Sequence, residues 1–148
     1  MSNIDLIIKV YECFFSGDLD GWSKLHTDDF ELKQPGSFPH SGTFIGPSVA
    51  IEESFSKLPL TLTNLALEPI SFFESGNTVL VHALMSAENL RAETMHMFTI
   101  TDGLVSKYQG FDDTLAIADS SKISWADHPE SSTFEKGLGP FFLFLQVR

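Results

Sequence analysis

The side chains best suited to proton transfer fall on two predicted strands in the second half of the chain. His96 lies within residues 91–101, and Asp112 closes residues 104–112. An imidazole titrates near neutrality and a carboxylate can accept a proton, so the pair suits general acid–base catalysis. Each also has a purely structural interpretation, His96 as a hydrogen-bonded wall residue and Asp112 as a carboxylate that caps the strand end. Both interpretations stay open at this point.

Strand alternation predicts which neighbours share a face with this pair. If His96 points inward, the inward set on the two strands also includes Thr94, Phe98, Ile100, Tyr108 and Gly110. We expect Tyr108 to donate a hydrogen bond from the wall of a site, because a buried phenol usually finds a partner. His82 lies on another predicted strand, and its parity does not reveal which face it occupies.

Two further polar side chains belong to a loop rich in proline and glycine. Gln34 ends the first predicted strand, and His40 follows in the loop, where binding residues are common. His40 is either part of a site or a surface residue. The five histidines form no H-x-H or H-x-x-x-H pair, so the sequence predicts no metal site. The single cysteine, Cys13, lies in an apolar helical pattern and is interpreted as a core residue.

Three helices are predicted in the first part of the chain. The first begins with a capping box formed by Ser2 and Asp5, and its apolar residues recur at helical spacing. It ends just before Asp18, which caps a second, shorter helix. A third helix is expected to begin at Pro47 and to end at Pro59. Its predicted buried face consists of Ile51, Phe55 and Leu58.

The remaining segments have the period of strands. A short strand near residues 30–34 lies between the second and third helices. Four longer strands follow, predicted over residues 60–74, 78–87, 91–101 and 104–112, with Asp102-Gly103 as the strongest hairpin signal. Helices followed by an antiparallel meander indicate an α+β fold.

Two of these strands are apolar on both faces, most clearly over residues 78–85. An antiparallel strand with one solvated face alternates polar and apolar residues, so here both faces need cover. We expect helices on one face and a second subunit on the other, which predicts a homodimer. The alternative cover is the chain's own tail, in which Ser120-Ser121 is interpreted as loop. The aromatic run at residues 141–145 is expected to be buried.

Composition excludes several classes of protein. A length of 148 residues fits one domain, and 43% apolar residues support a real core. The formal net charge of −11 argues against binding to nucleic acid and to anionic membranes. The sequence shows no signal peptide and no apolar run long enough to span a bilayer, so we expect a cytoplasmic protein.

Several short motifs follow one another along the chain. They are G-D-L-D at residues 17–20, Q-P-G-S-F-P-H-S-G-T at 34–43, F-I-G-P at 44–47, H-x-F-x-I-x-D-G at 96–103 and F-D-D-T at 111–114. In order and spacing they resemble the SnoaL-like, ketosteroid-isomerase-like branch of the nuclear transport factor two (NTF2-like) superfamily. The resemblance covers about residues 1–119 and implies a domain there, with residues 120–148 as an extension that packs on the domain or on a partner subunit.

The resemblance implies a cone in which three N-terminal helices pack on a strongly curved, mixed or antiparallel sheet around an apolar pocket. In ketosteroid isomerases the catalytic set is a carboxylate base, a tyrosine and a protonated aspartate. These positions fall on Gln34, on Val10 and on His96, with Tyr11 displaced by about 100° around the helix. The final aspartate of limonene epoxide hydrolases falls on Gly110. We therefore expect neither reaction.

The sequence thus predicts a SnoaL-like protein that binds a small apolar molecule. It is expected to be a cofactor-independent isomerase, cyclase or dehydratase of a carbonyl or polyketide-like substrate, with His96 and Asp112 as the catalytic pair. The expected substrate-binding residues are Gln34, His40, Tyr108, Phe14, Trp22, Phe44, Phe55 and Phe98. The alternative is a non-catalytic module for ligand binding, dimerisation or partner docking.

Overall fold

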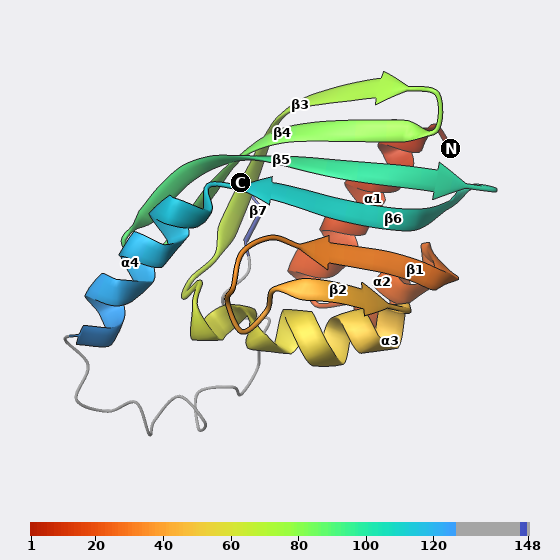
Figure 1. Cartoon of the computed structure of the whole chain (residues 1–148). Helices are drawn as coiled ribbons and strands as arrows, with labels where there is room; N and C mark the ends of the chain where they lie inside the picture. The colour runs from red at the N-terminus through yellow and green to blue at the C-terminus, as the bar shows by residue number, and fades with distance from the viewer. Residues whose placement is uncertain (127–145, 148) are drawn as a thin grey trace.

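A curved sheet carries helices on one side in the computed structural model, which describes residues 1–126 and 146–147 (Figure 1). Its helices are α1 (Asn3–Ser16), α2 (Leu19–Lys24), α3 (Pro47–Val49) and α4 (Thr114–Ala126). Its strands are β1 (His26–Gln34), β2 (Gly42–Ile45), β3 (Ala66–Ser75), β4 (Thr78–Ala87), β5 (Leu90–Thr101), β6 (Leu104–Asp112) and β7 (Gln146–Val147). The predicted α+β fold is confirmed.

The sheet is mixed, in the order β2-β1-β6-β5-β4-β3-β7. Strand β1 runs parallel to β6 and β3 runs parallel to β7, whereas the other neighbouring strands pair antiparallel. In Figure 1, α1 crosses behind the meander and α4 projects from the end of β6. The pairing of β5 with β6 places His96 directly opposite Gly110.

The two N-terminal helices begin and end where the sequence predicts. The Ser2 hydroxyl accepts a hydrogen bond from the backbone N–H of Asp5, and the Asp5 carboxylate accepts one from the N–H of Ser2. Gly17 ends α1 in the left-handed conformation, with φ of 79°, which glycine adopts without a Cβ penalty. The Asp18 carboxylate then caps α2 by accepting from the N–H of Gly21 at 2.8 Å.

The third helical segment is less regular than predicted. After α3, the chain forms a π-helical turn (Ala50–Ser54) and then a 3₁₀ helix (Phe55–Leu60). Pro59 lies inside the 3₁₀ helix instead of ending the segment before it. Of the predicted buried face, Phe55 and Leu58 are buried, and Ile51 is half-buried. Changes from α geometry of this kind are frequent next to functional sites.

Strand boundaries agree best in the last three strands of the meander. The bounds of β4 and β6 match the predicted strands, and β5 begins one residue earlier than predicted. Strand β1 begins at His26 instead of near residue 30. Strand β3 begins at Ala66 instead of residue 60, because the N–H groups of Thr61 and Leu62 both donate to the carbonyl of Leu58 and extend the helical segment. Edge strand β2 was not predicted, since four residues carry too little alternation.

Helix α4 replaces the loop predicted at Ser120-Ser121. The hydroxyl of Ser120 donates to the carbonyl of Ile117 at 2.8 Å, and that of Ser121 donates to the carbonyl of Ala118 at 3.0 Å. Serines that bond back to the preceding turn fit inside a helix, so the loop prediction is wrong. The helix also runs through the predicted boundary at residues 119–120. The aromatic run at 141–145 lies outside the described residues.

The hydrophobic core lies between α1 and the face of the sheet that this helix covers. Its fully buried members come from both layers and include Ile7, Phe30, Leu32, Val79 and Val81. Within the described part of the chain, no helix is long and apolar enough to cross a membrane.

Candidate functional site

A cavity of about 90 Å³ lies between the helices and the sheet. Apolar and aromatic side chains from α1, α2, the 3₁₀ helix and the meander form most of its wall. The polar side chains around it are Tyr11, Trp22, His26, Gln34, His40, His96, Tyr108 and Asp112. No lysine or arginine is among the described residues that line it.

The central polar contact joins α1 to β5. The hydroxyl of Tyr11 lies 2.7 Å from Nδ1 of His96, in a buried hydrogen bond. On the other side of the ring, Nε2 of His96 lies 4.0 Å from Oδ1 of Asp112. The hydroxyl of Thr94 donates to the same carboxylate oxygen. Tyr11, His96 and Asp112 therefore form a line along the cavity wall, with a direct hydrogen bond between Tyr11 and His96 and a longer separation between His96 and Asp112.

Burial sets the protonation of this line. It lowers the pKa of His96 to about 4, an effect that the Asp112 carboxylate opposes. Burial and the same carboxylate raise the pKa of Tyr11 well above 10. At neutral pH the imidazole is uncharged and the phenol is protonated. Because Nε2 faces a carboxylate, the arrangement favours a proton on Nε2 and a hydrogen bond donated by Tyr11 to Nδ1.

Gly110 leaves space for two more polar groups beside His96. A Cβ at this position would meet the Tyr108 hydroxyl at 3.0 Å and Oε1 of Gln34 at 3.5 Å. These two groups are therefore at most 6.5 Å apart, the sum of the two distances. The ring of Tyr108 contacts that of His96 edge to face, with centroids 5.2 Å apart. Burial, Asp112 and Tyr11 raise the pKa of Tyr108 well above 10, so its hydroxyl remains a donor.

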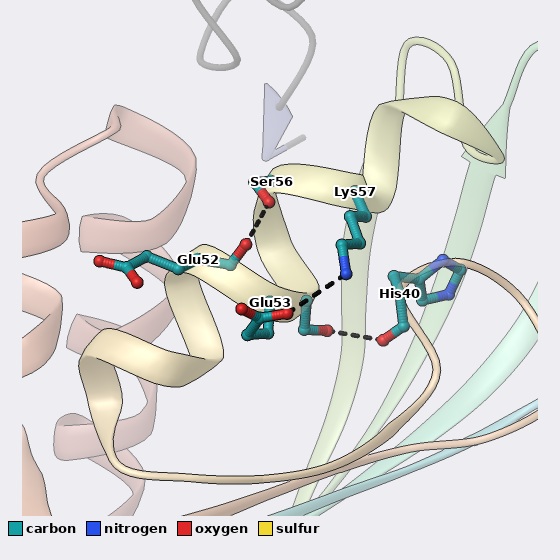
Figure 2. Close-up of polar contacts among 6 residues, drawn as sticks. His40, Glu52, Glu53, Ser56 and Lys57 are labelled. Carbon is teal, nitrogen blue, oxygen red and sulfur yellow. Dashed lines mark hydrogen bonds and ion pairs between the residues drawn. The ribbon is translucent and has the colours of Figure 1, made fainter.

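His40 is buried at the cavity, with 2% of its surface exposed. Its carbonyl accepts a hydrogen bond at 2.7 Å from the hydroxyl of Ser54, the last residue of the π-helical turn (Figure 2). Its ring stacks on Phe38, with centroids 5.5 Å apart and planes at 10°. Burial lowers the pKa of His40 to about 4, partly offset by Asp112. The surface interpretation of His40 is therefore wrong.

His26 is a cavity residue that the sequence analysis missed. Its Nδ1 donates to the carbonyl of Trp22 at 2.7 Å, and its ring lies over the indole, with centroids 3.8 Å apart. Burial lowers its pKa to about 4, against the effect of the hydrogen bond to Trp22. The signal that could have revealed it is the start of the first strand at His26, which puts this residue on the same strand as the core residue Phe30. The rings of His26 and Phe30 are in contact.

The structure brings most of the predicted site residues to one cavity. The members that line it are Phe14, Trp22, Gln34, His40, Phe55, His96, Phe98, Tyr108 and Asp112. Phe44 does not line this cavity and packs at the margin of the core on β2, so its expected place was wrong. Tyr11 was set aside as one position off, yet both it and Val10 line the cavity. His82 lies on the opposite face of the sheet, where Nε2 is 3.0 Å from Oε1 of Glu93.

Comparison with protein families matches residues 7–108 to the SnoaL-like domain. The chain belongs to this family. TerC, whose crystal structure contains polyporic acid, is 25% identical with a TM-score of 0.74, over 81% of this chain and 98% of that chain. An NTF2-like protein of unknown function from Burkholderia pseudomallei is 22% identical with a TM-score of 0.73, over 82% and 98%. No functionally curated protein matches the sequence.

A third solved structure with this fold carries the name of an enzyme class. A protein named as a SnoaL-like polyketide cyclase, from Jannaschia sp. CCS1, is 18% identical with a TM-score of 0.68, over 80% of this chain and 90% of that chain. At this identity the likeness shows a common fold. The predicted SnoaL-like family membership is confirmed by the family match and by these structures.

Proposed function

We propose that this SnoaL-like protein binds a small apolar molecule that carries a carbonyl or hydroxyl group and moves a proton on it without a cofactor. The observation that carries the proposal is the line from Tyr11 through His96 to Asp112 in the wall of a mostly apolar cavity. Apolar cavities with a few convergent polar groups are the usual setting of small-molecule sites. Titratable groups shifted by burial are the usual setting of acid–base chemistry.

The geometry suggests a distinct role for each polar group. With Nδ1 of His96 held by Tyr11 and its ring proton on Nε2, Asp112 is the group free to accept a proton from the ligand. The hydroxyl of Tyr108 is placed to donate to the ligand oxygen on which negative charge develops, and Gln34 orients the same end. The proton then returns to another atom of the ligand, which is an isomerisation, or accompanies the loss of water, which is a dehydration.

The similarity to TerC supports the ligand class. That protein is co-crystallised with polyporic acid and shares 25% identity with this chain. The cavity here offers aromatic walls from Phe14, Phe55 and Phe98, as well as neutral hydrogen-bonding groups. Aromatic side chains contact flat ligands favourably by stacking or by edge-to-face contact. We therefore propose an aromatic or polyketide-like carbonyl compound as the substrate.

Exchange of hydrogen next to a carbonyl group tests the proposal without knowledge of the natural substrate. Full-length protein is incubated with 2-tetralone in D₂O, and loss of the α-proton signals is followed by NMR. We expect exchange above the buffer rate, and an Asp112→Asn variant should be about 10²- to 10⁴-fold slower than wild type. The control is Glu93→Gln, because this carboxylate lies on the opposite face of the sheet and is exposed. Binding of 2-tetralone without faster exchange would contradict catalysis and leave a binding protein.

A second candidate function is assembly through the outer face of the sheet. Phe73 and Phe111 are each about half exposed there, at 54% and 51%. Exposed apolar side chains grouped on one face usually mark an interaction surface. This observation favours a homodimer, with or without catalysis in the cavity.

The cytoplasmic location remains a prediction from the sequence.

A further inference from the structure

His40 carries a buried nitrogen whose hydrogen-bonding capacity is unused. Nδ1 of its ring has no hydrogen-bond partner among the described residues, although only 2% of the residue is exposed. Buried polar atoms in native proteins are nearly always paired, with protein groups, water or ligand. Because His40 lines the cavity, a polar group bound there is the candidate partner for this nitrogen.

The loop that holds His40 opposes any rotation of the ring away from the cavity. The carbonyl of His40 is fixed by Ser54, itself fully buried, and the ring is stacked on Phe38. The hydroxyl of Ser41 accepts from the N–H of Phe38 at 3.0 Å and donates to the carbonyl of Pro35 at 2.6 Å. Figure 2 shows the His40 ring extending from this loop toward the strands. These contacts hold the polar ring of His40 within a mostly apolar cavity wall.

The chemistry of the ring limits what it can bind. Because burial keeps the imidazole neutral near pH 7, the ring offers one N–H donor and one acceptor nitrogen. A hydroxyl or carbonyl oxygen matches either nitrogen. The described residues that line the cavity include no cationic side chain to pair with an anionic group, and Asp112 would repel one. The expected partner is an uncharged oxygen function.

His40 and the Tyr108–Gln34 pair reach the cavity from different elements. His40 lies on the loop between β1 and β2, whereas Tyr108 is on β6, and Gln34 ends β1. We infer that His40 recognises a second oxygen function of the ligand, so that the substrate class is an uncharged aromatic or polyketide-like compound with two oxygen functions. This inference rests on the proposed function, because it assumes that the first oxygen lies at Tyr108 and Gln34.

Matched naphthols test this inference in the full-length protein. Dissociation constants are measured calorimetrically at pH 7 for 1- and 2-naphthol and for 1,5-, 2,6- and 2,7-dihydroxynaphthalene. We expect at least one diol to bind about three- to tenfold more tightly than the matching naphthol, the range of one net hydrogen bond. His40→Phe should abolish this preference, which is a ratio of affinities and does not depend on the variant's affinity for naphthol itself. The control Phe55→Leu should weaken naphthol and diol by the same factor.

A measurement on the wild type keeps the test valid if His40→Phe fails to fold. In ¹⁵N-labelled protein, the imidazole nitrogen resonances of His40 should shift with the preferred diol and not with the naphthol. Naphthols that bind with no preference for any diol and no His40 shift would overturn the inference and leave the proposed function standing. Absence of binding by every compound would contradict both. A diol preference retained in a folded His40→Phe protein would also overturn the inference.

Discussion

Burial lowers the pKa of three imidazoles around one cavity. His26, His40 and His96 each have a pKa lowered to about 4 from the usual 6.5, with burial as the largest cause. The unfolded chain takes up protons at these sites near pH 6.5, whereas the native chain does so only near pH 4. Stability is therefore expected to be full above pH 6.5 and to fall as the pH drops toward 4.

This dependence can be measured by urea denaturation between pH 7.5 and 4. Each buried imidazole contributes up to about 3 kcal/mol to the change, so the protein should lose much of its stability over this range. His26→Phe should reduce the slope by roughly a third. The control Thr27→Val removes a buried, unpaired hydroxyl from the same strand and should leave the slope unchanged. Stability that stays level from pH 6.5 to 4 would contradict burial of these rings.

At the scale of elements, α4 was the least expected feature. One of its side chains, Ile117, is 1% exposed and belongs to the core cluster, whereas Leu115 on the same helix is 71% exposed. Its start is fixed by Asp113, whose carboxylate accepts from the N–H of Ala116 at 2.9 Å. The cap follows directly after Asp112, so the helix also holds the end of the strand that carries this carboxylate.

Two substitutions on α4 test whether the helix is part of the domain. Ile117→Ala should lower the free energy of unfolding by about 2 to 4 kcal/mol, because it leaves a cavity in the core. Leu115→Ala removes a similar apolar side chain from an exposed position and should change it by less than about 0.5 kcal/mol. Chemical denaturation gives both values. Equal, small effects from the two variants would show that α4 does not stabilise the domain.

The whole molecule presents an apolar outer face. The register aligns Phe73, Leu80 and Met97 in one row across the meander, and His82, Met95 and Phe111 in another. Phe73 and Phe111 are exposed, and the aliphatic members are half-buried. Exposed apolar patches of this kind usually mark a surface that another surface covers. The homodimer predicted from the sequence would supply that cover.

Charges placed on this face test the predicted dimer. Phe73→Glu and Phe111→Glu are expected to convert a dimer into monomers, because each buries an unpaired carboxylate in the interface. Light scattering coupled to size-exclusion chromatography measures the mass. Leu115→Glu, on the exposed face of α4, serves as the control and should keep the mass of the wild type. A wild-type protein that is monomeric at micromolar concentration would contradict this prediction.

The sequence by itself determined the properties that depend on local pattern. The apolar run over residues 78–85 predicted β4, and the Asp102-Gly103 turn predicted the start of β6. Period-two alternation predicted the shared face of His96, Phe98 and Ile100, because a side chain's direction follows from its position along a strand. Ser2 and Asp5 likewise predicted the start of α1, since a cap involves neighbours a few residues apart.

Only the tertiary structure decided which elements meet. Tyr11 and His96 are 85 residues apart, and their hydrogen bond depends on how α1 lies across β5. The motif spacing of the resemblance placed the expected tyrosine at Val10, one position from Tyr11, but the side chain of Tyr11 still reaches the cavity. The burial of His40 depends in the same way on Ser54 and the π-helical turn, which no local pattern indicates. Such contacts arise from the packing of whole elements, and packing is not encoded in the spacing of residues along any one of them.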